Sequence, residues 1–113
     1  DIAYPSSNKQ LYNRIINEDR GAVVSEYMPG IRPEKWRFPQ RNRIVSGMSR
    51  AVIVIEAGQE SGALITAKIA FEQNRDVFAI PGRTDNLMSM GTNKLIAHTK
   101  AHMIRHVGDV MYK

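Results

Sequence analysis

The stretch that decides the fold is Ala51-Val52-Ile53-Val54-Ile55, a run of five apolar residues near the middle of the chain. Four of the five side chains are β-branched, and no polar residue alternates with them. Such a run is typical of a strand that is buried on both faces in a parallel sheet. We therefore expect the chain to be built around a buried parallel strand.

The segments on either side of this run alternate between helical and strand patterns. After it we expect a helix over 61–73, a strand over 76–80, a short helix near 92–98 and apolar stretches at 103–104 and 107–111. Before it we expect a helix over 9–19 that stops at Gly21, a strand over 22–27, a basic loop over 31–39 and a helix over 40–48. This order predicts βαβ units with right-handed crossovers, and hence an α/β, three-layer Rossmann-like fold with a mostly parallel sheet.

Length and composition limit the classes of protein. The chain has 113 residues, which suits one domain. A doubly wound sheet needs more strands than these, and the chain starts at Asp1, so we expect residues 1–113 to be one partial domain with part of its sheet missing. The absence of cysteine excludes a disulfide scaffold, a thiolate nucleophile and Cys-ligated zinc. No apolar run approaches bilayer length and no signal segment opens the chain, which predicts a cytoplasmic protein.

The charge of the chain is concentrated in one window. The net charge is +5, and six basic residues stand between positions 32 and 50 with Glu34 as the only acid: Arg32, Lys35, Arg37, Arg41, Arg43 and Arg50. The rest of the chain is neutral overall, with ten basic and ten acidic side chains. The window is either a solvated charged face or a site for a polyanion.

Two aromatic residues, Trp36 and Phe38, are interleaved with these cations. Cations that neutralise phosphates beside rings on which bases stack are what single-stranded nucleic-acid grooves require. Arg41 and Arg43 also fall near the start of the helix expected over 40–48, where backbone N–H groups favour anions. For Trp36 we expect that it plugs the sheet edge, whereas for Phe38 packing and stacking remain equal alternatives.

A second candidate site follows the buried strand. Ser61-Gly62 begins the next helix at the carboxyl edge of the sheet, where α/β folds bind ligands, and its backbone N–H groups are suited to a phosphate. The segment matches neither GxGxxG nor a Walker A motif. The alternative is an ordinary helix cap with Gly62 present for close packing.

Candidate catalytic and metal-binding groups are few. Glu26 and Glu56 end two expected strands, and paired carboxylates can perform acid–base chemistry. His98, His102 and His106 are spaced four apart, but 101–104 resembles a strand more than a helix, so we expect no metal site.

Several short motifs, in order along the chain, resemble the DprA (Smf) family of DNA-processing proteins. They are Tyr-Pro-x-x-Asn at 4–8, Val-Ser-Glu-Tyr at 24–27, Phe-Pro-x-Arg-Asn-Arg-Ile at 38–44, Val-Ile-Glu-Ala at 54–57, Ser-Gly-x-Leu-Ile-Thr-Ala at 61–67, Ile-Pro-Gly at 80–82 and Gly-x-Asn-x-Leu-Ile at 91–96. Ala63 and Thr99-Lys100 depart from the family pattern, which commonly has serine and Gly-Ala there.

The resemblance implies a non-catalytic protein of natural transformation, without cofactor, that binds and protects incoming single-stranded DNA and loads the recombinase RecA onto it. The DNA-contacting positions that it implies are Lys35, Phe38, Arg41, Asn42 and Arg43, with Ser61 and Gly62 on the pocket floor. It also implies a homodimer, with Leu95, Ile96, Met103 and Ile104 as candidate contacts. By the same resemblance, we expect residues 1–113 to be the part of the family's domain that follows its N-terminal βαβ portion.

An enzyme is the alternative interpretation. The fold expected here also resembles that of nucleotide-binding phosphoribohydrolases of the lysine-decarboxylase-like group. Those enzymes carry Pro-Gly-Gly-x-Gly-Thr followed by a catalytic glutamate, whereas this chain has Glu56-Ala57-Gly58-Gln59-Glu60-Ser61-Gly62 at the corresponding strand end. The missing glycine run disfavours hydrolysis, although Glu56 is present.

Overall fold

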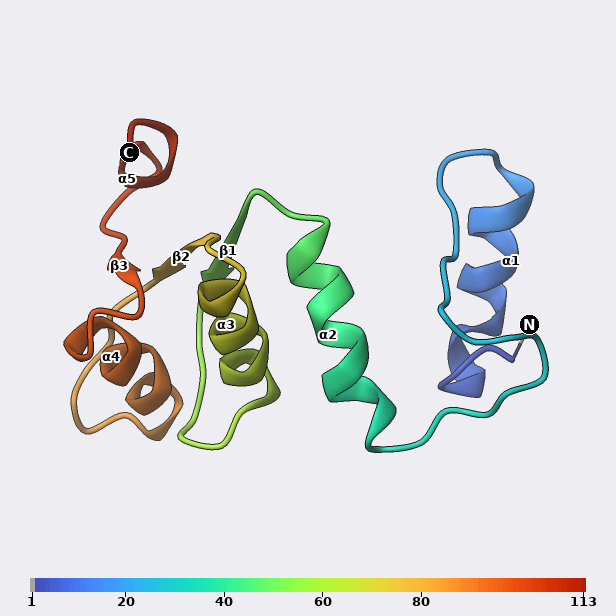
Figure 1. Ribbon diagram of the computed structural model, residues 1–113, viewed down its shortest axis with the longest axis horizontal. Coiled ribbons are helices and arrows are strands. Elements are labelled where there is room, and N and C mark those ends of the chain that lie inside the picture. Colours follow the sequence, from blue (N-terminus) through green and yellow to red (C-terminus); the bar gives the residue numbers. More distant parts are fainter. Residues whose placement is uncertain (1) are drawn as a thin grey trace. The chain divides into compact units, whose positions relative to one another are not determined.

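A computed structural model describes residues 2–113, which form two compact units that meet between Lys35 and Trp36 in the sequence. The first unit contains a 3-10 turn, η1 (Ser6–Asn8), that runs directly into helix α1 (Lys9–Asn17) (Figure 1). The helix ends two residues before the predicted end because Asp19 adopts a left-handed φ of 54°, which stops helical geometry.

The second unit alternates helices and strands. Its elements are α2 (Arg37–Gly47), β1 (Ala51–Val54), α3 (Gly62–Glu72), β2 (Asp76–Ala79), η2 (Leu87–Ser89), α4 (Met90–Ala97), β3 (His102–Met103) and α5 (Gly108–Met111). The strands form one parallel sheet in the order β1-β2-β3, with Val52 opposite Val77 and Phe78 opposite His102. Helices α3 and α4 are the two crossovers, so the predicted α/β class, parallel sheet and βαβ units are confirmed.

Small residues let α3 lie close to the sheet. Ala67 and Ala70 of α3 pack on the face formed by Val54, Val77 and Ala79, and all five are buried. The neighbouring residue Phe78 points to the opposite face, because side chains alternate along a strand. There Phe78 is 2% exposed and lies beside the ring of His102 and the ammonium group of Lys113. Both faces of β2 are therefore covered.

Strand β1 is less buried than its sequence predicts. Val54 is buried against α3, whereas Ile53 on the other face is 45% exposed. The expectation of burial on both faces is wrong for this strand, because α3 covers only the Val54 face and Ile53 lies on the face opposite α3.

The strand predicted over 22–27 is also wrong, since the structure has no strand there. A strand needs a ladder partner to form, and the ladders in residues 2–113 join only β1 with β2 and β2 with β3. β-Propensity alone does not supply that partner. The premise that Glu26 ends a strand next to the strand of Glu56 is therefore wrong as well.

None of the helices in residues 2–113 has both the length and the apolar character that a bilayer crossing requires.

Candidate nucleic-acid interface

Helix α2 carries most of the candidate site, and it begins earlier than predicted. The loop expected to end at Pro39 and the helix expected from residue 40 are both wrong at this boundary, because α2 starts at Arg37. Pro39 is its third residue, where a backbone N–H has no partner within the helix, so proline is accommodated there. Phe38 therefore belongs to the first turn of a helix and not to an extended loop.

The first two turns of α2 bring an aromatic ring and a cation together at the surface. Phe38 is 38% exposed, and the guanidinium carbon of Arg41 lies 5.7 Å from the centroid of its ring. Residues three apart on a helix are neighbours, which explains the contact. Asn42 joins this group, because its Oδ1 accepts a hydrogen bond of 3.2 Å from Nε of Arg41. A partly exposed ring beside a guanidinium and an amide suits a base and its phosphate.

Trp36 forms a similar pair at the residue before the helix. The guanidinium carbon of Arg37 lies 4.9 Å from the centroid of the Trp36 ring. Trp36 is 53% exposed, so the expectation that it plugs the sheet edge is wrong. The charge window consequently offers two exposed aromatic rings, each beside an arginine, within six residues of sequence.

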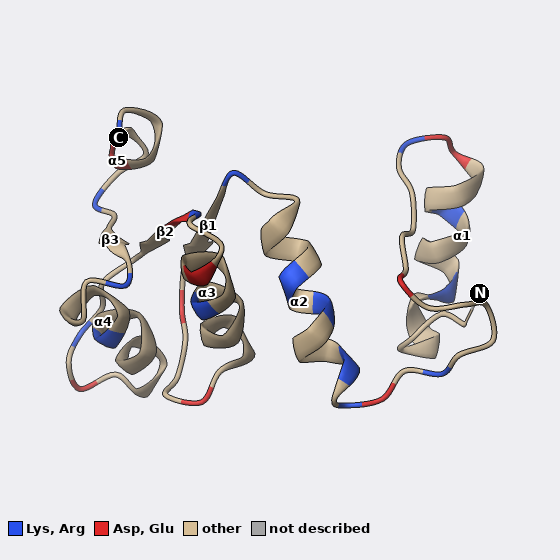
Figure 2. Cartoon of the chain, in the orientation of Figure 1, with Lys and Arg blue, Asp and Glu red and all other residues tan. Residues whose placement is uncertain are grey.

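The two arginines of the Arg-Asn-Arg motif lie on different sides of α2. Successive helical residues are rotated by about 100°, so Arg41 and Arg43 are about 200° apart around the axis. Both are exposed. They also lie beyond the first helical turn, because α2 begins at Arg37, so the expectation that they stand at a helix N-terminus is wrong. Figure 2 shows Lys and Arg positions along α2 and no acidic one.

Lys35 is exposed and is the last residue of the first unit, two positions before α2 in the sequence.

Ser61 and Gly62 stand at the start of α3. The Oγ atom of Ser61 accepts a hydrogen bond of 3.2 Å from the backbone N–H of Ala63, which makes Ser61 the N-cap. A Cβ atom added at Gly62 would meet no atom within 4 Å, so close packing does not explain this glycine. The tight approach occurs instead at Gly91, where a Cβ atom would lie 2.6 Å from the carbonyl oxygen of Gly58.

Helices α2 and α3 pack against each other, and Figure 1 shows their N-terminal ends at the same end of the second unit. Phe38 and Ser61 therefore both belong to that end. The sequence order helix–strand–helix did not by itself indicate this arrangement.

A hydrogen-bonded network at the other end of these helices holds α2 in place. Gln73 follows α3, and its side chain accepts a bond of 2.8 Å from Oγ of the buried Ser46 and donates one of 3.0 Å to the carbonyl of Arg43. Arg75 donates a bond of 2.6 Å to the carbonyl of Gly47. Sequence reasoning did not identify these positioning residues, because their partners lie 27 to 30 positions away.

The four candidate dimer contacts differ in exposure. Leu95 and Ile96 of α4 are half-buried against the core, and Ile104 is half-buried, whereas Met103 of β3 is 46% exposed. Within residues 2–113 no group of three or more His, Asp or Glu side chains is arranged to hold a metal ion. His102 lies in β3, which confirms the strand expected there, so the three histidines do not share a helix face.

The family described as DNA recombination-mediator protein A matches residues 1–113, which is the whole chain. The chain belongs to this family. Protein Smf of Synechocystis is 50% identical to it over 104 residues, 92% of this chain and 25% of that protein. DNA processing protein DprA of Streptococcus pneumoniae is 50% identical over 96 residues, 85% of this chain and 33% of that protein. The chain thus spans between a quarter and a third of the length of these relatives.

Two solved structures of the family resemble the whole of this chain. The X-ray structure of DprA from Streptococcus pneumoniae has a TM-score of 0.87 at 45% identity. The match covers 100% of this chain and 39% of the Streptococcus pneumoniae chain. The structure of DNA processing protein A from Helicobacter pylori has a TM-score of 0.79 at 30% identity. The match covers 99% of this chain and 50% of the Helicobacter pylori chain. The latter is described as revealing that protein's unique single-stranded DNA binding mode. These matches confirm the Rossmann-like α/β fold.

Proposed function

We propose that this chain is a single-stranded DNA-binding module of a cytoplasmic recombination mediator, with α2 as its main DNA-contacting element. The observation that carries the proposal is the exposed Phe38 ring beside Arg41, within the window that holds the whole net charge. Membership of the recombination-mediator family and the single-stranded DNA binding described for the Helicobacter pylori relative support it.

Each candidate residue has a chemical role in this proposal. Phe38 stacks on a base, while Arg41 and Arg43 neutralise phosphates on two sides of α2. Lys35 adds a cation just before the helix, and Asn42 supplies an amide to the Arg41 group. At Ser61-Gly62 the backbone N–H of Gly62 offers a weaker phosphate contact, because the N–H of Ser61 already donates to the carbonyl of Gly58 and the Ser61 hydroxyl caps α3.

The biological role that we propose is to protect incoming single-stranded DNA and to load the recombinase RecA onto it during natural transformation. A homodimer of the whole protein would present two such DNA sites. Family membership supports this role, and the exposed Met103 on an edge strand is compatible with self-association.

The proposed role requires no covalent chemistry. The alternative is hydrolysis of a nucleoside monophosphate to base and ribose phosphate, and within residues 2–113 no side-chain hydrogen bond or ion pair of Glu56 supports it. We expect no free base when the chain is incubated with adenosine monophosphate and the products are separated by chromatography. Base release that is lost in Glu56→Gln would establish the enzyme instead.

A salt titration tests the DNA site. The affinity for a 20-residue oligothymidylate, measured by fluorescence anisotropy at several salt concentrations, should have a log–log slope that flattens by about 0.7 in Arg41→Ala and again in Arg43→Ala, because each loses one phosphate contact. Lys35→Ala should behave in the same way.

Lysines outside the window serve as controls for this titration. Lys68 is exposed and forms no ion pair among residues 2–113, and Lys113 is ion-paired with Asp76. Neither Lys68→Ala nor Lys113→Ala should change the slope. If these variants flatten it as much as Arg41→Ala does, then DNA binding is diffuse and the assignment of the site to α2 is wrong.

A further inference from the structure

Trp36 is the second exposed aromatic ring of the charge window. It is 53% exposed, and the guanidinium carbon of Arg37 lies 4.9 Å from the centroid of its ring. Tryptophan is highly buried on average in folded proteins, so core packing does not account for a ring with this exposure. Its φ of −69° and ψ of −18° are helical, so Trp36 continues the geometry of α2 by one residue toward the N-terminus.

The rings of Trp36 and Phe38 lie on different sides of α2. Successive helical residues are rotated by about 100°, so residues two apart differ by about 200° around the axis. Residues seven apart differ by only about 20°, which places Trp36 on the same side as Arg43. Phe38 shares its own side with Arg41, three residues further on. Each side of α2 therefore carries one aromatic ring and one arginine.

The surface of α2 between the two rings is suited to a phosphate backbone. The helix contains three arginines and no acidic residue. Arg37 lies beside the Trp36 ring and Arg41 lies beside the Phe38 ring. Gln40, which is exposed, stands between Trp36 and Arg43 and adds a neutral amide to their side. Arginines that neutralise phosphates can thus hold a strand across the helix while a base stacks at each ring.

The separation of the two rings determines how a strand can be bound. A helix with its side chains is about 10–12 Å across, whereas stacked bases in a DNA strand follow one another about every 3.4 Å. Two neighbouring stacked bases therefore cannot reach rings on different sides of α2. Only a strand whose bases are unstacked from each other can contact both rings, and a duplex does not permit this.

We propose that Trp36 stacks on a second base of the DNA strand, on the other side of α2 from the base that Phe38 binds. The strand crosses the N-terminal half of α2 between the two rings, and Arg43 neutralises a phosphate next to the second base. This inference rests on the proposed DNA-binding function and deepens it. It makes the pair of rings the feature that selects single-stranded DNA over a duplex.

The fluorescence of Trp36 tests the inference directly, because this residue is the only tryptophan of the chain. Titration with the 20-residue oligothymidylate should quench its emission, since a base stacked on the ring is in direct contact with it. The midpoint should equal the midpoint of the anisotropy titration. A duplex of the same length should leave the emission unchanged at concentrations that saturate with the single strand. The measurement uses the original chain, so it does not depend on the folding of a variant.

Variants of the ring test its contribution to affinity. Trp36→Ala should weaken oligothymidylate binding by about tenfold, as expected for one stacked base, with no change in salt dependence because no phosphate contact is lost. Trp36→Phe retains a ring and should restore most of the affinity. The double variant Trp36→Ala/Phe38→Ala should bind about a hundredfold more weakly than the original chain, because separate sites contribute independently.

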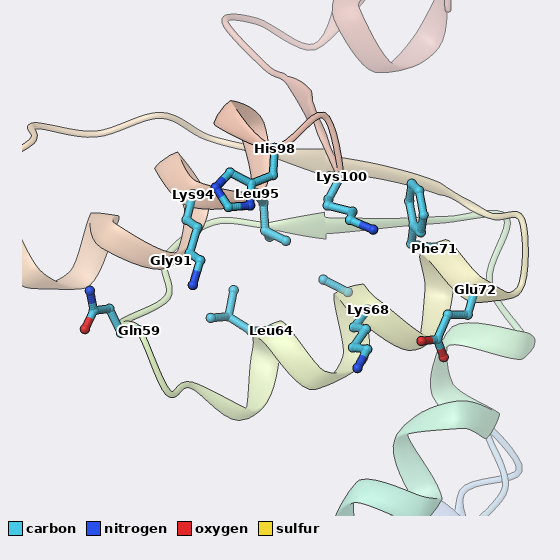
Figure 3. Close-up of a pocket in the computed structure, with 11 residues that line it drawn as sticks. Gln59, Leu64, Lys68, Phe71, Glu72, Gly91, Lys94, Leu95, His98 and Lys100 are labelled. Carbon is cyan, nitrogen blue, oxygen red and sulfur yellow. The ribbon is translucent and has the colours of Figure 1, made fainter.

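Phe71 provides the matched control. It is 42% exposed, and Nζ of Lys100 lies 4.3 Å from the centroid of its ring. It lines a groove of about 300 Å³ between α3 and α4, and none of the described residues that line this groove belongs to α2 (Figure 3). Phe71→Ala thus removes a ring of similar exposure beside a cation, but outside the charge window. It should leave oligothymidylate affinity unchanged.

Three results would overturn the inference and leave the proposed function standing. The first is saturable binding in the anisotropy titration with unchanged Trp36 emission, or equal quenching by the duplex. The second is a double variant that binds as tightly as Phe38→Ala, which would show that Trp36 holds no base of its own. The third is an equal loss of affinity in Phe71→Ala, which would show that binding to exposed rings is not confined to α2. Absence of any binding by anisotropy would instead contradict the proposed function, and the inference with it.

Discussion

At the scale of single residues, two phenylalanines of this chain show how location decides what a ring does. Phe38 is 38% exposed in the first turn of α2, whereas Phe78 is 2% exposed in the central strand. The two side chains are chemically identical, and both lie near a cation. Only Phe38 presents a surface on which a base can stack.

Replacement of Phe38 should therefore affect binding more than folding. Phe38→Ala should weaken oligothymidylate binding by about tenfold, which corresponds to about 1.4 kcal/mol and lies within the range for one stacked base. The salt dependence should not change, because no phosphate contact is lost. The matched variant Phe78→Ala should instead cost about 3–5 kcal/mol of unfolding free energy, measured by urea denaturation. A Phe38→Ala chain that loses stability and binds normally once folded would place this ring in the core.

At the scale of elements, α2 depends on contacts that lie outside it. Gln73→Ala removes the bonds to Ser46 and to the Arg43 carbonyl, and it should lower the unfolding free energy by about 1–2 kcal/mol. In this variant, amide hydrogen exchange should accelerate more in α2 than in β2. The affinity for DNA should fall as well. The neighbouring variant Glu72→Ala, at an exposed position, should stay within about 0.5 kcal/mol of the original chain. Equal exchange rates in both variants would show that Gln73 does not position α2.

Helix α5 is stabilised by a carboxylate whose protonation can be followed. Arg105 donates side-chain and backbone hydrogen bonds to Asp109, of 3.0 Å and 2.8 Å, and these hold the pKa of Asp109 well below its usual value. Because the pKa is depressed in the folded state, the stabilisation is complete above about pH 4 and is lost as the pH falls toward the folded-state pKa.

Titration of the carboxyl group by NMR measures this coupling. In Arg105→Gln, the pKa of Asp109 should move up toward 3.8, and the amide signals of α5 should change at a higher pH than in the original chain. The control Arg83→Gln should raise the pKa of Asp85, its own partner, and leave that of Asp109 in place. An unchanged Asp109 titration in Arg105→Gln would contradict the assigned cause.

At the scale of the whole molecule, the proposed dimer is best probed through Met103. It is the exposed member of the four candidate contacts, and it lies in β3, which pairs only with β2 in the described sheet. Met103→Glu should convert dimers to monomers in sedimentation while the circular dichroism spectrum remains native, because a charge is costly in an apolar interface. Met48→Glu, which changes an exposed methionine after α2, should leave the dimer intact. A wild-type chain that sediments as a monomer at high concentration would remove the interface.

Local signals in the sequence were sufficient for the elements that form the sheet. The apolar runs at 51–55 and 76–80 predicted β1 and β2 to within one residue, and Ser61 marked the start of α3 because its hydroxyl caps the helix. The charge window and its aromatic residues were likewise visible without a structure. These features depend on side chains that are neighbours in the sequence.

Other properties depended on residues that are distant in the sequence, and only the tertiary structure decided them. Residues 22–27 have a strand pattern but no ladder partner, and Ile53 is exposed because it lies on the face of β1 opposite α3. Helix α2 starts early, and Pro39 is compatible with this because it is the third residue of the helix. Gln73 and Arg75 hold the C-terminal half of α2 by hydrogen bonds to its carbonyl groups. The sequence determined the apolar runs of β1 and β2, the cap of α3 and the charge window, since these features are local, whereas strand pairing, exposure and the grouping of side chains required the packed fold.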